Sequence, residues 1–341
     1  MKKKFLLIGG AGFIGTQLTK TLLARPQHSV HVIDNFSRSS REKHTLIQMA
    51  EESTALTVTS ADLTKKESLE LLDKTYDYLV MLAAVVGVDK ANGQPHEVIR
   101  INTLLTINVL EWLETAHVEK VVFCSTSETY AGTVSSFNFQ VPTAESVPLC
   151  IEDITHPRFS YAVTKMLGES GFINFARQGH FECCVVRYHN VYGPNMGFRH
   201  VIPHLVERFM AKENPFLIYG HDQTRAFNYI DDAVEGTILA AEKGRNLEVY
   251  HIGDEDEITI EALTRFVAER LGFTGELRYA PTFPGSVARR CPDIAKARLE
   301  LGYTPSVGWK QGVSKTVDWY VNYITKNPLH ESFYLQKDPE T

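Results

Sequence analysis

The sequence predicts an α/β protein with a doubly wound parallel sheet and a smaller C-terminal α/β lobe. Up to about residue 190, short apolar runs alternate with amphipathic stretches, as in a parallel sheet whose strands are buried on both faces. A glycine-rich turn joins the first apolar run to the first amphipathic stretch. Beyond residue 190 the predicted elements are shorter and separated by loops, as expected of a second lobe.

The predicted elements of the first part alternate regularly. Apolar runs predict strands at residues 5–8, 30–33, 56–58, 78–82, 121–123 and 183–188. Helical spacing of apolar residues predicts helices at residues 16–23, 41–52, 65–72, 99–115 and 161–178. The polar stretch 131–157 contains several prolines, and we expect it to be irregular and to cover a site.

The second part is predicted from shorter patterns. We expect helices at 201–212 and 260–271, a strand at 216–219, and a strand followed by a helix over 227–242. The expected division is a sheet domain over residues 1–190, to which residues 226–252 return, a lobe over residues 191–330, and a frayed tail over residues 331–341.

Composition excludes several classes of protein. The formal net charge of −6 leaves no basic excess to neutralise nucleic-acid phosphates, so we expect no nucleic-acid partner. The basic start and the apolar run 5–8 imitate a secretory signal, but the run is too short, and no apolar run could span a bilayer. A cytoplasmic protein is expected. The five cysteines form no C-x-x-C pair and no H-E-x-x-H occurs, so free thiols and no metal site are expected.

The first turn has the residues of a dinucleotide-binding loop. Gly9, Gly12 and Gly15 stand between a strand and a helix, where backbone N–H groups and the positive end of the helix dipole can approach a pyrophosphate. Asp34 ends the second strand, 19 residues after Gly15, where a carboxylate binds an adenosine ribose and repels a 2′-phosphate. NAD in a Rossmann-type domain is therefore expected. Arg38 leaves NADP open, and a loop that only makes a tight turn is the alternative.

Two later strand ends also suit a dinucleotide. Asp62 and Leu63 could hold an adenine ring through one acceptor and one apolar wall, although Asp62 could also only cap the following helix. The small residues Ala83 and Ala84 would let the backbone pass close to a cofactor.

Tyr161 and Lys165 are the candidate catalytic pair. They lie one turn apart on a predicted helix and project from the same face. An ammonium group near a phenol lowers the phenol pKa, so Tyr161 could remove a proton from a hydroxyl while a hydride leaves the same carbon. Ser125 or Thr126, at a strand end, could orient the reacting oxygen, or these hydroxyls could only cap the strand.

Together these motifs resemble the extended short-chain dehydrogenase/reductases, and among them the nucleotide-sugar epimerases, dehydratases and decarboxylases. The resemblance runs from Phe5 to about Tyr320 and is carried by the glycine loop, Asp34, Asp62-Leu63, Leu82-Ala83-Ala84, Tyr161-x-x-x-Lys165 and segments 187–194, 223–232 and 290–294. It implies tightly held NAD that oxidises a sugar hydroxyl, usually at C4, and later returns the hydride. It also implies a homodimer formed through the helices at 99–115 and 161–178.

The resemblance implies roles for individual residues. Tyr161 would be the base, and Lys165 its electrostatic partner and a ribose ligand. Arg225 and Arg290 would bind the nucleotide diphosphate through charge-assisted hydrogen bonds, although either arginine could also form only a surface ion pair. The residues expected to bind substrate are Asn190, Arg199, Arg225 and Arg290. The residues expected at the cofactor are Gly9, Gly12, Phe13, Ile14, Gly15, Asp34, Asn35, Asp62, Leu63, Ala83, Ala84, Asn102, Tyr161 and Lys165.

Glu128 suggests which reaction follows the oxidation. Thr126-Ser127-Glu128 resembles the triplet of GDP-mannose-type 4,6-dehydratases and UDP-glucuronate decarboxylases, so Ser127 is also a candidate site residue. Beside a C4 ketone the C5 proton is acidic, and a glutamate can remove it and help expel the C6 hydroxyl. A C6 carboxylate would instead leave as carbon dioxide. The alternatives are a 4-epimerase, a non-catalytic NAD-binding regulator, and a Glu128 that only caps a turn.

Overall fold

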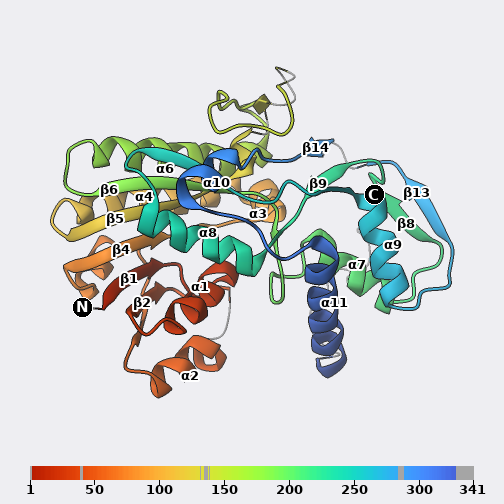
Figure 1. Ribbon diagram of the computed structural model, residues 1–341, viewed down its shortest axis with the longest axis horizontal. Coiled ribbons are helices and arrows are strands. Elements are labelled where there is room, and N and C mark those ends of the chain that lie inside the picture. Colours follow the sequence, from red (N-terminus) through yellow and green to blue (C-terminus); the bar gives the residue numbers. More distant parts are fainter. Residues whose placement is uncertain are drawn as a thin grey trace.

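The computed structural model describes residues 2–38, 41–130, 132–133, 137, 139–282 and 288–327. The tail expected over residues 331–341 lies outside the described residues, as do five residues of the stretch expected to be irregular, 131, 134–136 and 138. Figure 1 shows a large sheet flanked by helices, with a group of shorter elements beside it.

Seven parallel strands form the central sheet, in the order β11-β6-β5-β4-β1-β2-β3. Their bounds are β1 Lys3–Ile8, β2 His28–Asp34, β3 Leu56–Ser60, β4 Thr75–Met81, β5 His117–Thr126, β6 Glu182–Tyr188 and β11 Glu248–Ile252. The chain builds outward from β1 to β3 and then returns to add β4 on the other side of β1. This reversal creates a crevice at the carboxyl ends of β1 and β4, where ligands bind in open α/β sheets. The predicted doubly wound fold is confirmed.

Helices cover both faces of this sheet (Figure 1). In β1, Phe5 and Leu7 pack in one buried cluster with side chains of α1 and α8, whereas Leu6 and Ile8 pack in a second cluster with side chains of α4 and α6. All four β1 side chains are fully buried, which explains why the strand is continuously apolar. The helices around the sheet are α1 Phe13–Leu23, α2 Thr45–Glu52, α3 Val88–Gly93, α4 Pro95–Leu113, α6 Ser160–Ala176 and α8 Ile230–Lys243.

The shorter elements beside the sheet bring two arginines together. In a three-stranded sheet ordered β12-β9-β14, Arg225 of β9 is paired in register with Arg290 of β14. The strands of this region are β7 Val191–Tyr192, β8 Phe216–Tyr219, β9 Thr224–Ala226, β10 Asn228–Tyr229, β12 Glu257–Thr259, β13 Leu277–Ala280 and β14 Arg289–Arg290. The helices are α7 Val201–Met210, α9 Ile260–Arg270, α10 Ala295–Leu301 and α11 Trp309–Lys326.

Several boundaries differ from the predicted ones. Helix α1 begins three residues earlier than predicted, inside the glycine-rich turn, and α4 begins at Pro95, a residue suited to the first helical turn. The predicted helix 41–52 is a 3₁₀ turn, η1 Arg41–Lys43, followed by α2. The predicted helix 65–72 is a 3₁₀ helix, η2 Lys66–Leu71. Helices α3, α10 and α11 and strands β7, β9 and β11 to β14 were not predicted.

No helix in the described part of the chain combines the length and the apolar character needed to cross a membrane.

Candidate active site

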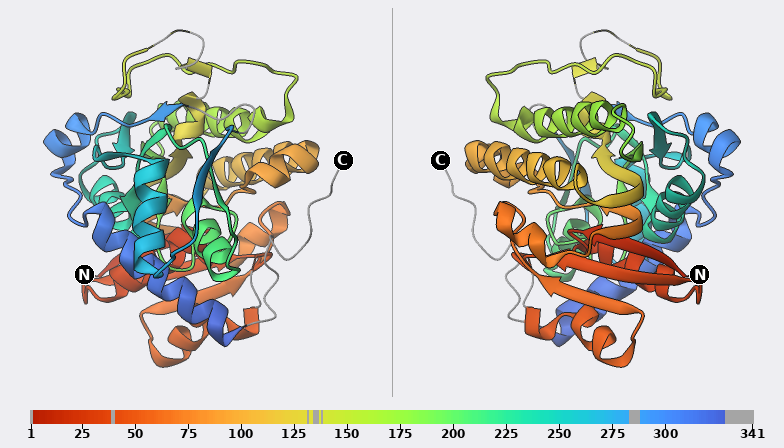
Figure 2. Two further views of the ribbon diagram at one scale, coloured as in Figure 1. Left: turned by 90° about the vertical axis from the view of Figure 1, so that its right-hand side faces the viewer. Right: turned by 90° about the vertical axis from the view of Figure 1, so that its left-hand side faces the viewer.

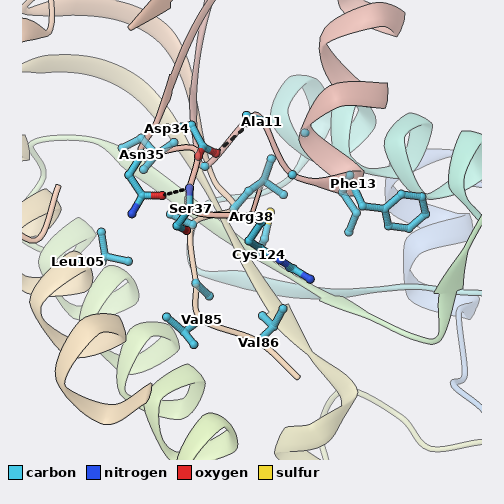
Figure 3. A pocket seen from close by; sticks show the side chains of 18 of the residues that line it. Ala11, Phe13, Asp34, Asn35, Ser37, Arg38, Val85, Val86, Leu105 and Cys124 are labelled. Carbon is cyan, nitrogen blue, oxygen red and sulfur yellow. Dashed lines mark hydrogen bonds between the residues drawn. The ribbon is translucent and has the colours of Figure 1, made fainter. Parts of the chain in front are cut away.

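A pocket of about 310 Å³ opens at the carboxyl ends of the central strands, at the reversal of strand order. Figure 3 shows it from close by, with Asp34 and Asn35 in the upper part of the view, Val85 and Val86 in the lower part, and Arg38 between them. The expected cofactor residues in its wall are Gly9, Gly12, Phe13, Ile14, Gly15, Asp34, Asn35, Asp62, Leu63, Ala83, Ala84, Tyr161 and Lys165.

Two glycines of the first turn are required by close packing. Gly9 has φ +81°, and a Cβ atom there would lie 2.5 Å from the backbone of Ala83. A Cβ atom on Gly15 would lie 2.5 Å from the Cα atom of Gly10. The loop therefore folds tightly enough for the first turn of α1 to enter the pocket wall, with its free N–H groups available to a pyrophosphate.

Asp34 is held in place by backbone groups. Its Oδ2 atom accepts a hydrogen bond from the N–H of Ala11 at 3.0 Å, and its Oδ1 atom accepts one from the N–H of Phe36 at 2.7 Å. The bond to Ala11 is visible in Figure 3. The carboxylate thus has a fixed position beside the glycine loop, with lone pairs left for ribose hydroxyls.

Asp62 and Asn102 have structural partners. Asp62 lines the pocket, but its Oδ1 atom also accepts hydrogen bonds from the N–H and hydroxyl of Thr64, at 3.0 and 2.8 Å. Asn102 is buried behind the wall, where it accepts from the N–H of Val85 at 2.7 Å and donates to its carbonyl. Asn102 therefore positions a pocket-lining segment and is absent from the pocket wall itself.

Tyr161 and Lys165 lie on α6 and line the pocket. Lys165 is buried, and its Nζ atom donates to the carbonyl of Cys124 at 2.6 Å. Burial lowers the pKa of Lys165 to about 8. The pKa of Tyr161 is raised by burial and by the charge of Glu128, while a hydrogen bond with the Thr126 side chain acts in the opposite direction.

The structure distinguishes the two neighbouring hydroxyls that the sequence left equivalent. The Thr126 side chain meets Tyr161. The Ser125 hydroxyl donates instead to Oε1 of Glu169, at 2.5 Å, and Arg187 binds both oxygens of Glu169 at 2.9 and 2.6 Å. Because side chains alternate along a strand, one of two adjacent residues is turned away from the tyrosine. The buried Glu169–Arg187 pair was missed, since no short motif joins them.

Glu128 lies in a cluster of arginines. Its Oε1 atom is 2.6 Å from Nη1 of Arg290, and its Oε2 atom is 3.8 Å from Nη2 of Arg158. The charge of Arg290, with smaller effects of Arg158 and Arg225, holds the pKa of Glu128 below its ordinary value despite burial. Glu128 is therefore an ionised carboxylate at neutral pH. Arg158 was not predicted as a site residue.

Arg225 lacks an anionic partner among the described residues. Its guanidinium donates to the carbonyls of Thr224 and Ala288 and to the side chain of Gln223. Burial and the neighbouring charge of Arg290 lower the pKa of Arg225 to about 10. Three guanidiniums thus surround one carboxylate, and this excess of positive charge suits a bound anion.

The stretch predicted to cover the site, residues 131–157, contacts the chain next to β14, the strand that carries Arg290. It is the yellow-green loop that arches above the helices in both views of Figure 2. Thr143 accepts from the N–H of Asp293 at 2.8 Å and donates its own N–H to Cys291 at 2.9 Å, next to Arg290. These bonds fix the position of β14 relative to the loop.

The other two residues expected to bind substrate, Asn190 and Arg199, do not line this pocket. The side chain of Asn190 donates to the carbonyl of Ala226 at 2.9 Å and so sits between β6 and β9. Arg199 is exposed and precedes His200, which lines the pocket. Ser127 is buried. In the described part of the chain, no group of three or more histidine, cysteine or acidic side chains could hold a metal ion.

Comparisons with known proteins show the family and agree with the fold. The model of the NAD dependent epimerase/dehydratase family matches residues 5–253. The UDP-N-acetyl-alpha-D-glucosaminuronate decarboxylase of Bacillus cytotoxicus is 32% identical over 94% of this chain and 98% of its own length. The structure of the UDP-glucuronic acid 4-epimerase from Bacillus cereus, in complex with UDP-glucuronic acid and NAD, is similar with a TM-score of 0.81 and 26% identity, over 94% of this chain and 99% of that one. The dTDP-glucose 4,6-dehydratase from Streptomyces venezuelae, with NAD bound, is similar with a TM-score of 0.81 and 27% identity, over 95% and 98%.

Proposed function

The chain belongs to the NAD-dependent epimerase/dehydratase family, and we propose that it oxidises a nucleotide-diphosphate uronic acid at C4 and then releases its C6 carboxylate as carbon dioxide. The observation that carries this proposal is the ionised Glu128, which lies beside Arg158 and close to the Tyr161–Thr126 pair. A simple 4-epimerase needs no carboxylate at this place. The 32% identical relative is a decarboxylase by name.

NAD is the cofactor, as Asp34 predicted. The pocket fits it: the glycine loop allows the backbone to approach a pyrophosphate, and the fixed Asp34 carboxylate stands where ribose hydroxyls need acceptors. When bound, NAD accepts a hydride from the sugar and later returns it.

Tyr161 would accept the proton of the C4 hydroxyl. The hydrogen bond between Thr126 and Tyr161 would hold the phenol in position for that hydroxyl. Burial keeps the pKa of the tyrosine high without ligands, so Tyr161 needs nearby positive charge to act as a base. Lys165 supplies part of this charge when it is protonated, which below pH 8 is its main form.

Release of carbon dioxide would follow directly from the C4 carbonyl. The C5–C6 bond breaks, its electron pair enters the conjugated carbonyl system as an enolate, and a proton from water then restores C5. The negative charge of Glu128 would repel the C6 carboxylate and favour its conversion to neutral carbon dioxide. In a dehydration, ionised Glu128 would instead remove the C5 proton and pass it to the departing C6 hydroxyl, so its charge fits both reactions, and the 32% identical decarboxylase favours decarboxylation.

The direct test is product analysis. The protein should be incubated with UDP-glucuronic acid, UDP-N-acetylglucosaminuronic acid, UDP-glucose and dTDP-glucose, and the products weighed by mass spectrometry. Loss of the mass of carbon dioxide from a uronic acid is the expected result. Loss of water from a neutral sugar would establish a dehydratase, and an unchanged mass with an inverted C4 would establish an epimerase. Either outcome would refute the proposal.

Glu128→Gln tests the carboxylate. We expect decarboxylation to fall about 10²- to 10⁴-fold, the usual range for a group acting at the reacting atoms, while the first hydride transfer persists and is visible as nicotinamide absorbance. Glu119→Gln is the control, because Glu119 is an exposed carboxylate paired with Lys3 at the other end of β5. Full activity of Glu128→Gln would remove Glu128 from the reaction.

A further inference from the structure

We propose that Arg158 is the residue by which this site prefers sugars with a carboxylate at C6 over neutral sugars. The inference rests on the proposed function, because it concerns the same substrate. It concerns a residue for which neither the sequence motifs nor the likeness to known proteins assigns a role.

Arg158 lies on the 3₁₀ turn η4 Pro157–Phe159, which leads directly into α6. It precedes Tyr161 by three residues. Its side chain is 22% exposed, and its Nη2 atom lies 3.8 Å from Oε2 of Glu128. The guanidinium is thus largely shielded from water, where an ion pair is stronger than at an exposed surface.

The neighbours of Arg158 indicate which part of a sugar it would meet. Thr126 and Tyr161 mark the place of the C4 hydroxyl, and the backbone N–H of Glu128 bonds to the Thr126 hydroxyl at 3.2 Å. In a pyranose, C5 and its C6 substituent are adjacent to C4, whereas C1 with its diphosphate lies across the ring. Arg158, beside Glu128, is therefore placed for the C6 substituent.

The other two arginines have a different position. Arg225 and Arg290 are register partners on β9 and β14, and Arg290 is already bonded to Oε1 of Glu128 at 2.6 Å. The two negative charges of a nucleotide diphosphate suit this pair. Arg158 comes from a different segment and remains for a third anionic group.

Charge explains why an acidic sugar would need Arg158. Glu128 would repel a C6 carboxylate, and no carboxylate other than Glu128 pairs with Arg158 among the described residues. A guanidinium has five N–H donors and can bind two carboxylates at once. Arg158 can therefore hold Glu128 and the sugar carboxylate together. A hydroxymethyl group at C6 would gain little from this cation.

The test is a binding measurement that does not depend on turnover. In a Tyr161→Phe background that retains NAD, isothermal titration gives the dissociation constants of UDP-glucuronic acid, UDP-glucose and UDP. With Arg158→Gln we expect the affinity for UDP-glucuronic acid to fall about 10- to 100-fold, the effect of losing a charge-assisted hydrogen bond. The affinities for UDP-glucose and UDP should change by less than about threefold. Arg158→Lys keeps the charge but lacks the fork of donors, so its affinity for UDP-glucuronic acid should lie between those of the native residue and Arg158→Gln.

Arg289→Gln is the matched control, because Arg289 adjoins Arg290 but pairs with Glu257 at 2.7 Å. It should change none of the three affinities. Equal losses for UDP-glucuronic acid and UDP-glucose, or no loss for either, would overturn the role of Arg158. If the protein with Arg158 intact fails to bind the uronic acid and binds UDP-glucose, the proposed function itself fails, so the two failures are distinguishable. Retained NAD and an unchanged melting temperature would show that each variant is folded.

Discussion

The cofactor pocket and the arginine cluster are built in different ways. The part of the pocket wall where we expect the pyrophosphate comes from a short stretch between Gly9 and Gly15, with Asp34 close behind it. The cluster joins Glu128, Arg158, Arg225 and Arg290 from four separate segments. A continuous stretch can be recognised as a motif, whereas a cluster of this kind exists only after folding.

The two regions also differ in how their charges are satisfied. Asp34 is held by two backbone N–H groups before any ligand arrives. Arg225 has only uncharged acceptors among the described residues, and the pKa of this arginine is lowered. The cofactor side is thus preformed, whereas the arginine side has positive charge that we expect an anion to neutralise. Variants on each side should therefore fail in different ways.

The largest effect is expected at the junction of the two regions. Tyr161→Phe removes the phenol that would take the C4 proton, so turnover should fall about 10²- to 10⁴-fold. The purified variant should still carry NAD, measured by its release on denaturation, because the glycine loop and Asp34 are untouched. If turnover survives, Tyr161 is not the base, and loss of NAD instead would mean that Tyr161 mainly holds the cofactor.

A smaller effect is expected on the arginine side. Arg225→Gln should weaken binding of UDP, measured by isothermal titration, about 10- to 100-fold, while bound NAD stays unchanged. Arg278→Gln is a suitable control, because Arg278 lies on β13 of the same region and pairs with Glu276 in exposed positions. If both variants weaken the binding of UDP equally, Arg225 does not bind the diphosphate.

These differences explain how far the sequence could predict the molecule. The fold followed from alternating patterns, and the strand runs were right because buried parallel strands are continuously apolar, as Phe5 to Ile8 are. NAD was predicted from one loop and one carboxylate. Helix α11 was missed although Val313, Val317 and Tyr320 have helical spacing and are buried, so the signal was present.

The rest depended on contacts that spacing does not encode. Nothing in a strand-end sequence says whether Ser125 or Thr126 faces the tyrosine, because one residue of register exchanges the two faces. Arg158 meets Glu128 although the two residues lie 30 positions apart in the sequence. The domain boundaries, the homodimer and the cytoplasmic location stay predictions.

A stability effect is expected in the glycine loop. Gly9→Ala should lower the free energy of unfolding by about 2–3 kcal/mol, since it combines a positive φ with a Cβ atom 2.5 Å from the backbone of Ala83. It should also reduce NAD content. Gly179→Ala separates the two causes, because Gly179 has φ +85° and no atom within 4 Å of the added Cβ atom. Equal losses in the two variants, measured by urea unfolding, would mean that the close approach to Ala83 costs nothing.

The smallest effect has the opposite sign. Lys165 is buried with a pKa lowered from 10.5 to about 8, so at neutral pH the folded protein carries a buried cation at a cost of about 3 kcal/mol. Lys165→Met should remove this cost and lose the bond to Cys124, so the free energy of unfolding should rise by about 1–2 kcal/mol while activity is lost.

The pH dependence identifies the cause of this gain. Below pH 8 Lys165 is protonated in both the folded and the unfolded chain, so the full cost is present. Between pH 8 and 10.5 the folded protein releases the proton first, and the native protein becomes more stable relative to the variant. Urea unfolding at pH 7 and pH 9.5 should therefore show a smaller difference at the higher pH. A difference independent of pH would mean that the charge of Lys165 costs the folded protein nothing, and that the cofactor side differs in this from the arginine side, where burial and Arg290 lower the pKa of Arg225.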